Sequence, residues 1–297
     1  MNTRAAEPSS QSWNVLRLLN WTRDHFTQRE VDSPRLAAEV LLARCLDCTR
    51  IDLYTRYDQE PSAAQLAAFR ELVRRAAAHE PVAYLVGEKE FYSLKFKVNP
   101  HVLIPRPETE ILVTEAVGCL RALGRPARVW DACTGCGCVG IAIAHQIVDA
   151  QVLISDLSTE ALAVAQQNVE ALGVADRVRC CQADLLDLPA AHAEMKPFDV
   201  ITANPPYIRA GETLAAVVEH EPKMALFGGA DGLRFLRRII DEAPALLAPG
   251  GVLVLEFGFD QGDDVRDLIV AQDRFDEPRI LMDHQELERV AVALCAG

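Results

Sequence analysis

The sequence predicts an α/β protein in which a small helical bundle precedes a mostly parallel, seven-stranded sheet. From residue 127 onward, short apolar runs typical of buried strands alternate with longer runs typical of helices, which indicates a parallel sheet covered on both faces. Before residue 81, alanine and leucine dominate and strand-forming residues are few. We therefore expect a helical domain over residues 1–85, a hairpin linker over 86–105 and the sheet domain over 106–297.

Three helices are expected in the first domain. The first covers residues 12–28, where apolar side chains recur at helical spacing. The second begins at Asp32 or Ser33, with Pro34 in its first turn, because proline is favoured at that position. The third begins at Ser62, a residue type that caps helix N-termini. The stretch "EFYSLKFKVNPHVLIP" then has alternating apolar positions, which predicts a hairpin that links the two domains.

The sheet domain follows in regular order. Its expected strands are "RVWDAC", "QVLISD", "RVRCCQAD", "FDVITAN", "GGVLVLEFG" and two near residues 279–282 and 290–294. Its expected helices include "VGIAIAHQI", "STEALAVAQQNVEALG" and "GLRFLRRIIDEAPALL". Ligands of such folds bind beyond the carboxyl ends of the strands, so candidate site residues are sought there.

Composition and charge exclude several classes of protein. The 297 residues are half hydrophobic and carry a net charge of −13, and no apolar run reaches the ~18 residues of a membrane span. Residues 91–297 contain 18 Lys and Arg against 30 Asp and Glu, a balance opposite to that of a surface that neutralises phosphates. No secretion signal is recognisable, and nine scattered cysteines, an odd number, are typical of reduced thiols. We expect a cytoplasmic monomer that contacts neither membranes nor free nucleic acid.

A glycine-rich loop follows the first strand of the sheet. In "DACTGCGCVG", Gly135, Gly137 and Gly140 form G-x-G-x-x-G, which allows a tight turn and close approach of a ligand. Asp156 ends the next strand, where a carboxylate can accept hydrogen bonds from ribose hydroxyls, and Asp184 ends the third strand. Together these features indicate a cofactor that contains a nucleoside. NAD and S-adenosylmethionine (AdoMet) both fit the spacing.

Three cysteines lie in the same loop, at positions 133, 136 and 138. A zinc site needs about four ligands, and no histidine cluster stands nearby. We therefore interpret these thiols as small apolar filler and predict no metal site.

The fourth strand ends in Asn204-Pro205-Pro206-Tyr207. The Asn204 side chain and the Pro205 carbonyl are two acceptors, and the prolines fix the direction of the backbone. Two rigid acceptors can hold both hydrogens of an –NH₂ group and turn its nitrogen toward an electrophile. The flat ring of Tyr207 could pack on a planar substrate. A proline-rich turn that only closes a strand is the alternative.

The motif "NPPY" resembles the signature of AdoMet-dependent amino-methyltransferases. The stretches "PVAYLVGEKEFYSLKFKVNPHVLIPRPETE", "EPKMALFGGADGLRFLRRII" and "GGVLVLEFGFDQG" are similar to the PrmC/HemK family, and they occur in the expected order over nearly the whole chain. The resemblance implies a Rossmann-like methyltransferase domain and AdoMet as the cofactor. It also implies a substrate: the side-chain nitrogen of glutamine in the Gly-Gly-Gln loop of class I peptide chain release factors. The helical domain would dock that substrate.

The resemblance also assigns roles to residues. Asn204 and the Pro205 carbonyl would hold the glutamine amide, with Tyr207 beside it, so that these three are the catalytic residues. The substrate-binding residues would be Asn204, Pro205, Pro206 and Tyr207. The cofactor-binding residues would be Cys133, Thr134, Gly135, Gly137, Asp156, Asp184 and Asn204, with Asp156 on the ribose and Asp184 near the adenine. Arg106, Pro107 and Thr109 in "IPRPETE" would help to enclose the cofactor.

The sequence departs from the family at one loop position and leaves alternatives open. The family has D-x-G-x-G-x-G where Cys133 replaces the first glycine here. If this position needs a positive φ, a Cβ costs on the order of 1 kcal/mol or more. The alternatives are methylation of a ribosomal-protein glutamine, methylation of DNA adenine, a cofactor-binding module without catalysis, and an NAD oxidoreductase. The last leaves residues 204–207 unexplained.

Overall fold

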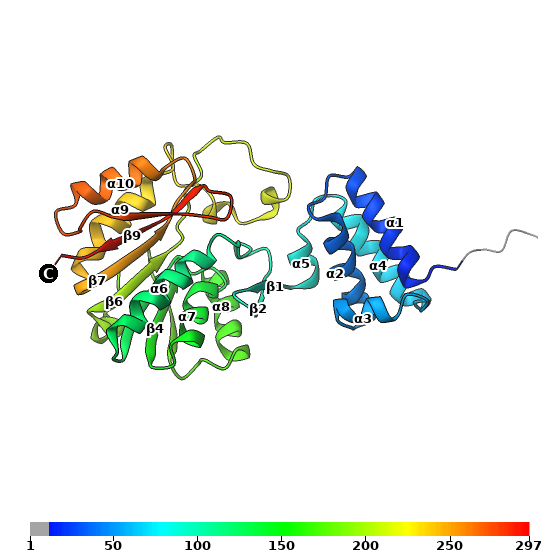
Figure 1. The fold of residues 1–297 in the computed structure, drawn as a ribbon, viewed down its shortest axis with the longest axis horizontal. Coiled ribbons are helices and arrows are strands. Elements are labelled where there is room, and N and C mark those ends of the chain that lie inside the picture. Colours follow the sequence, from blue (N-terminus) through cyan, green and yellow to red (C-terminus); the bar gives the residue numbers. More distant parts are fainter. Residues whose placement is uncertain (1–11, 297) are drawn as a thin grey trace, which may run out of the picture. The chain divides into compact units, whose positions relative to one another are not determined.

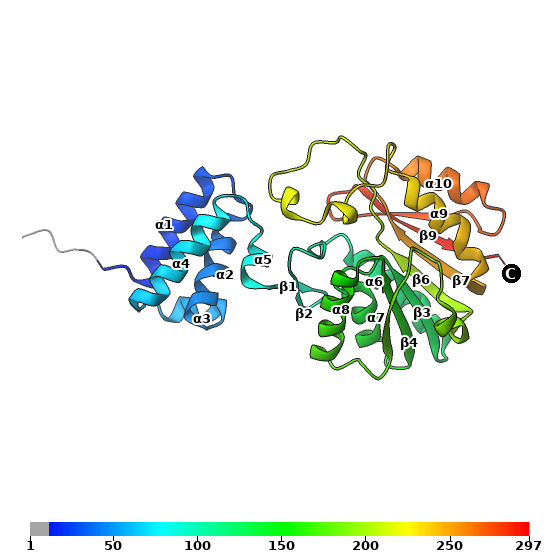
Figure 2. The same cartoon turned by 180° about the vertical axis from the view of Figure 1, so that it is seen from behind.

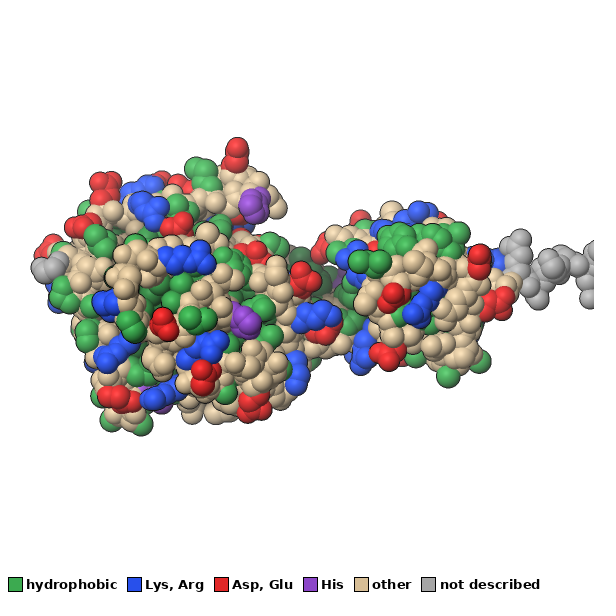
Figure 3. Space-filling model, turned by 60° about the horizontal axis from the view of Figure 1, so that its bottom comes forward, with side chains coloured by type: hydrophobic (Ala, Val, Ile, Leu, Met, Phe, Trp, Pro, Cys, Tyr) green, Lys and Arg blue, Asp and Glu red, His purple; other side chains and the backbone are tan. Residues whose placement is uncertain are grey.

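A computed structural model describes residues 12–296 of the chain (Figures 1 and 2). The described residues form two compact units, which are divided between Val86 and Gly87. In the described part, every helix is too short or too polar to cross a bilayer. The face in Figure 3 carries acidic and basic side chains interspersed, without a continuous basic stripe on that face.

The first unit is helical. Its helices are α1 (Val15–Gln28), α2 (Pro34–Leu46), α3 (Arg50–Thr55), α4 (Ala63–Ala76) and α5 (Val82–Val86). Ser62 caps α4 as expected, since its side chain accepts a hydrogen bond from the Gln65 N–H. Ser33 precedes α2 but makes no side-chain cap bond, because its backbone is left-handed, with φ +46°. The short helices α3 and α5 were not expected, because five or six residues are too few to show a helical period.

A two-stranded hairpin opens the second unit. Strands β1 (Glu88–Phe91) and β2 (Leu94–Lys97) pair antiparallel and bury Phe91 and Phe96. The Lys97 N–H donates to the Asn168 Oδ1 at 2.8 Å, and the Asn168 side chain donates in turn to the Cys136 carbonyl at 2.8 Å. The segment that we expected as a linker thus packs inside the second unit, because its two phenylalanines need a core.

A seven-stranded sheet forms the centre of the second unit. Its strands are β3 (Ala127–Ala132), β4 (Ala150–Asp156), β5 (Val178–Gln182), β6 (Phe198–Ala203), β7 (Leu247–Glu256), β8 (Arg279–Met282) and β9 (Glu288–Leu294). They lie in the order β5-β4-β3-β6-β7-β9-β8, and only β9 runs opposite to the others. The predicted fold class is confirmed, since all seven expected strands are present and mostly parallel.

Helices cover both faces of the sheet. They are α6 (Glu110–Leu123), α7 (Cys138–Gln146), α8 (Thr159–Ala171), α9 (Arg234–Glu242) and α10 (Gly262–Ala271). Alternation along the strands sends Trp130, Ile201 and Leu253 to the face that packs on α9 and α10. Helices α6, α7 and α8 contact the sheet at the opposite face, where Val129 and Val200 are buried (Figure 1).

The strand order fixes where a ligand can bind. From β3 the chain moves outward through β4 to β5, and it then returns to β6 on the other side of β3. The connections therefore diverge between β3 and β6, which leaves a crevice at the carboxyl ends of these two strands.

Candidate active site

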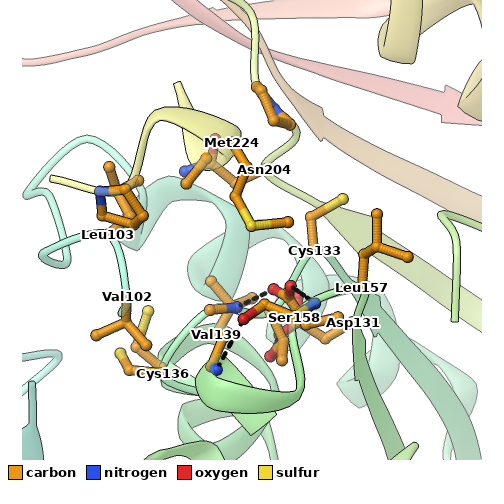
Figure 4. A pocket seen from close by; sticks show the side chains of 18 of the residues that line it. Val102, Leu103, Asp131, Cys133, Cys136, Val139, Leu157, Ser158, Asn204 and Met224 are labelled. Carbon is orange, nitrogen blue, oxygen red and sulfur yellow. Dashed lines mark hydrogen bonds between the residues drawn. The ribbon is translucent and has the colours of Figure 1, made fainter. Parts of the chain in front are cut away.

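The pocket lies at this divergence, at the carboxyl ends of β3, β4, β5 and β6. Of the predicted site residues, those that line it are Cys133, Thr134, Gly135, Asp156, Asp184, Asn204 and Pro206, together with Arg106 and Thr109. Pro107, Gly137, Pro205 and Tyr207 are not among the lining residues. Figure 4 shows Asn204 and Met224 on one side of the pocket, with Cys133, Asp131 and Ser158 on the side of the glycine-rich loop.

The glycine-rich loop is left-handed at three positions. Cys133, Gly135 and Gly137 have φ of +55°, +55° and +86°. A Cβ at Gly135 would meet no atom within 4 Å, so this glycine supplies a conformation and open space beside the pocket. A Cβ at Gly140 would lie 2.4 Å from the Ile154 side chain, so that glycine allows α7 to pack closely on β4. We expected the Cβ of Cys133 to cost energy if this position needs a positive φ, and its φ is indeed positive.

Asp131 is a positioning residue that the sequence analysis missed. It is buried at the end of β3, and its carboxylate accepts hydrogen bonds from the Thr134 hydroxyl, the Gly140 N–H at 3.0 Å and the Thr202 hydroxyl at 2.8 Å. Burial raises the pKa of Asp131 to about 6, against these three hydrogen bonds. Asp131 thereby holds both ends of the loop. Its place as the first residue of "DACTGCGCVG" was the available signal.

Asp156 ends β4 and supports the loop from the other side. Its Oδ2 accepts from the Gly135 N–H at 2.9 Å, and its Oδ1 accepts from the Ser158 N–H at 2.9 Å. Burial raises the pKa of this carboxyl, and the backbone donors oppose the rise. Each oxygen has a second lone pair, so Asp156 can still accept hydrogen bonds from ligand hydroxyls.

Asp184 follows β5 and is held by an ion pair. Its Oδ2 lies 3.0 Å from Arg238 Nη1 of α9, which fixes the carboxylate at the pocket wall. A single oxygen is engaged in this contact. The other can accept a hydrogen bond from a ligand amine.

Two of the loop thiols, those of Cys133 and Cys138, are neutral. Burial raises the pKa of Cys133 and of Cys138 well above the ordinary thiol value; for Cys138, hydrogen bonding with Cys136 contributes still more than burial. No group of three or more His, Cys, Asp or Glu among residues 12–296 is arranged to hold a metal ion. The thiols fill apolar space beside the pocket.

Asn204 comes directly after β6 and points its amide at the start of α6. Its Nδ2 donates to the Thr109 Oγ1 at 3.3 Å, which leaves the Oδ1 available to a ligand in the pocket. Thr109 is buried and lines the same pocket. Pro205 is buried and Pro206 is half-buried, so the chain turns inward at the first proline.

Tyr207 is held by its hydroxyl at the end of a neighbouring strand. Its hydroxyl donates to the Glu256 Oε1 at 3.3 Å, at the end of β7. Burial and the nearby Glu256 raise the pKa of Tyr207, so the phenol stays neutral. The ring is thus anchored by its hydroxyl and does not line the pocket.

Two residues clamp the backbone of the Asn-Pro-Pro-Tyr segment. The buried Gln261 donates from Nε2 to the Tyr207 carbonyl at 3.0 Å and accepts from the Gly258 N–H at 2.9 Å. Gly228 lies against the segment, since a Cβ there would come within 2.5 Å of the Pro206 carbonyl oxygen. Gln261 and Gly228 both lie in stretches that resemble the family. Their contacts with the Asn-Pro-Pro-Tyr segment could not be predicted from those stretches, because the segment lies more than 20 positions away in the sequence.

Glu221 binds the segment "IPRP" (residues 104–107), which contributes to one wall of the pocket. It is buried and forms an ion pair with Arg106, and its Oε2 accepts from the Ile104 N–H at 3.1 Å. This links the segment before α6 to Pro222, Met224 and Ala225, which also line the pocket. Arg106, expected to help enclose the cofactor, lines the pocket and is held in place by Glu221.

Comparison with known proteins gives consistent similarities. Residues 17–87 match the family described as PrmC N-terminal domain, and residues 111–225 match the methyltransferase small domain. The release factor glutamine methyltransferase of Rhodopirellula baltica is 45% identical over 258 residues, which are 84% of this chain and 86% of that protein. The protein of the same name from Chlorobaculum tepidum is 37% identical over 289 residues, 95% of this chain and 97% of that protein.

Solved structures agree with the fold. A methyltransferase from Pyrococcus furiosus superposes with a TM-score of 0.50 over 77% of this chain and 96% of that chain, at 17% identity. At that identity the likeness supports the fold alone.

Proposed function

The chain belongs to the family of release factor glutamine methyltransferases, and from this we propose that it methylates class I peptide chain release factors. The methyl group passes from AdoMet to the side-chain amide nitrogen of the glutamine in the Gly-Gly-Gln motif. The observation that supports this most strongly is Asn204, whose Oδ1 is left for a ligand at the edge of the pocket that the glycine-rich loop borders.

The pocket residues suit AdoMet. When bound, AdoMet supplies an electrophilic methyl carbon. Gly135 offers open space at a positive φ, and Asp156 retains lone pairs for the two ribose hydroxyls. Asp184 is placed to accept from the adenine amine. The three carboxylates that line the pocket, Asp131, Asp156 and Asp184, favour a ligand with a positive charge.

The Asn204 Oδ1 and the Pro205 carbonyl would accept the two N–H bonds of the glutamine amide. An amide nitrogen is a poor nucleophile because its lone pair is delocalised. Two acceptors in fixed positions favour the geometry in which that lone pair is localised, and they stabilise positive charge as it develops on nitrogen. We propose that the Tyr207 ring borders the glutamine while its hydroxyl stays on Glu256.

The helical unit would dock the release factor. A groove runs between α1 and α4, lined by apolar side chains that include Trp21, which is 50% exposed. Arg29, Arg70 and Arg74 also line it, and the described residues that line it include no carboxylate. We propose that an acidic segment of the release factor with apolar side chains binds there.

The test uses radiolabelled AdoMet and four separate substrates: a release factor, its Gln→Ala variant in Gly-Gly-Gln, ribosomal protein and duplex DNA. We expect label on the unaltered release factor alone. Label on the Gln→Ala variant, on ribosomal protein alone or on DNA alone would overturn the proposal.

One observation favours a second candidate, a cofactor-binding module without catalysis. Cys133 has a side chain at φ +55°, where the family has glycine, so the loop is strained. Calorimetry combined with the labelling assay separates the candidates, because a catalytically silent module binds AdoMet but labels none of the substrates.

A further inference from the structure

Glu221 is a buried carboxylate that the proposed function does not use. It lies where two segments of the pocket wall meet, the segment "IPRP" before α6 and residues 222–225 of the loop from β6 to α9. We propose that Glu221 is a positioning residue: it fastens these two segments together, so that the wall encloses the cofactor and slows its release. The inference rests on the proposed function for the cofactor alone, and its test needs no release factor.

Both carboxylate oxygens of Glu221 bind the segment "IPRP". The Oε2 accepts a hydrogen bond from the Ile104 N–H at 3.1 Å, and the Oε1 accepts one from Arg106 Nη2 within an ion pair. The Glu221 side chain has no exposed surface, so these contacts are shielded from water on its side. Ile104 and Glu221 are 117 positions apart. The carboxylate therefore cross-links two distant parts of the chain.

Residues on both sides of this cross-link line the pocket. They are Leu103, Pro105 and Arg106 on one side, and Pro222, Met224 and Ala225 on the other. Figure 4 shows Leu103 and Met224, one from each side of the cross-link, across the pocket from Asp131. A change in the distance between the two segments would therefore change the shape of the pocket.

The segment 222–225 has little packing of its own. Lys223 and Met224 are exposed, Met224 by 53%. Just beyond the segment, the Leu226 carbonyl accepts from the Ile208 N–H at 2.9 Å, and just before it Glu221 makes the contacts described above. The position of the segment in the wall thus depends on these two anchors, of which Glu221 is the one that reaches the segment "IPRP".

A second ion pair of similar construction lies at the other end of the sheet. Asp199 is buried, accepts from the Arg128 N–H at 2.8 Å and forms an ion pair with Arg125 at 2.5 Å. Asp199 and Arg128 are the second residues of β6 and β3, at the amino ends of these strands, and neither they nor Arg125 line the pocket. This pair provides a matched control, because its loss affects stability but not the pocket wall.

The test compares Glu221→Gln with Asp199→Asn. Each substitution keeps the shape of the side chain but replaces one acceptor oxygen by an NH₂ group, which cannot accept from an arginine. Protein preloaded with radiolabelled AdoMet is chased with unlabelled AdoMet, and the label that remains bound is followed by rapid filtration. We expect AdoMet to dissociate about tenfold faster from Glu221→Gln, because weaker binding is expressed mostly in the dissociation rate. Asp199→Asn should release AdoMet at the wild-type rate, although urea unfolding should show that both variants are less stable.

A double-variant cycle tests whether the ion pair carries the effect. If Glu221 acts through Arg106, the double variant Arg106→Gln/Glu221→Gln should release AdoMet no faster than the faster of the two single variants. Accelerations that multiply would show that the two residues act separately on the cofactor, and they would overturn the inference.

Glu221→Asp covers the case in which Glu221→Gln does not fold. It keeps the buried charge but is one methylene shorter, so it cannot hold both partners as before, and a smaller acceleration is expected. The wild-type dissociation rate in folded Glu221→Gln, or in Glu221→Asp if the first variant does not fold, would overturn the inference. Equal acceleration in Asp199→Asn would overturn it as well, since the effect would then be a general loss of stability. A wild-type protein that binds AdoMet but does not label a release factor would contradict the proposed substrate and leave this result intact.

Discussion

Cys133 carries a Cβ at a backbone position that favours glycine, with φ +55°. Its partly buried thiol stays neutral and therefore makes no charged contact that would offset this strain. We expect Cys133→Gly to bind AdoMet a few times more tightly, because it removes a side chain from the pocket lining and lets the left-handed backbone adjust to the cofactor without the ~1–2 kcal/mol that a Cβ costs there. Cys133→Val should bind more weakly, since a β-branched residue at positive φ is more strained.

Isothermal titration of AdoMet into the three proteins checks this order. A weaker Kd for Cys133→Gly would show instead that the thiol contacts the cofactor.

The raised pKa of Glu256 makes a prediction about stability. A carboxyl whose pKa rises from 4.5 unfolded to about 7 folded binds its proton more tightly in the folded state. Its contribution to stability is therefore complete below about pH 4.5 and is lost as the pH rises through 7. Glu256→Gln has no carboxyl to titrate at this position. Its free energy of unfolding, relative to that of wild type, should therefore increase by on the order of 3 kcal/mol between these two pH values.

Urea unfolding of both proteins at pH 5 and about pH 8 measures the difference. If the difference in unfolding free energy between Glu256→Gln and wild type did not depend on pH, it would contradict the conclusion that burial raises the pKa of Glu256 in the folded protein.

The loop from β6 to α9 holds the acceptor by close packing of backbone on backbone. The Gly228 N–H donates to the Ile208 carbonyl at 2.8 Å, and a Cβ on Gly228 would lie 2.5 Å from the Pro206 carbonyl oxygen. We expect Gly228→Ala to cost about 1–3 kcal/mol of stability and to lower kcat, since the Asn-Pro-Pro-Tyr segment must move. The same substitution at Gly118 in α6 meets no atom within 4 Å. It should stabilise by up to about 1 kcal/mol.

Thermal unfolding and turnover of both variants test this pair. Equal behaviour of Gly228→Ala and Gly118→Ala would show that the segment is not held by contact with Gly228.

The groove between α1 and α4 predicts a separation of substrate binding from chemistry. Trp21→Ala should raise the KM for the release factor roughly tenfold, because a large aromatic side chain in an apolar groove is a typical binding anchor. The kcat and the AdoMet Kd should hardly change. Ile51, 78% exposed on the same unit and outside the groove, gives the control Ile51→Ala. A KM that rises equally in both variants would argue against the groove.

For the whole chain, local patterns predicted the fold and the position of the pocket. The strand and helix alternation follows from side-chain periodicity, and the loop after β3 and the motif after β6 meet because parallel strands end at one edge of the sheet. Asp156, Asp184 and Asn204 could therefore be placed at one pocket from the sequence.

The contacts that orient these residues could not be predicted in this way. Asn204 and Thr109 are 95 positions apart, and Tyr207 and Glu256 are 49 apart. Such pairs are determined by how helices pack on the sheet, which periodicity does not specify. For the same reason the sequence could not show that the hydroxyl of Tyr207 is bound by Glu256 at the end of β7.

The charge of residues 91–297, 18 Lys and Arg against 30 Asp and Glu, agrees with a protein substrate rather than a nucleic acid.

The central claim is that Asn204 holds the glutamine amide, and the overall charge does not bear on it. That claim is tested most directly by Asn204→Ala, with AdoMet affinity measured by calorimetry and the release factor analysed by tandem mass spectrometry. We predict nearly normal AdoMet binding and a loss of about 100-fold or more in methylation of the Gly-Gly-Gln glutamine. Methylation at the wild-type rate, or a methyl group on any other residue in the wild-type reaction, would contradict it.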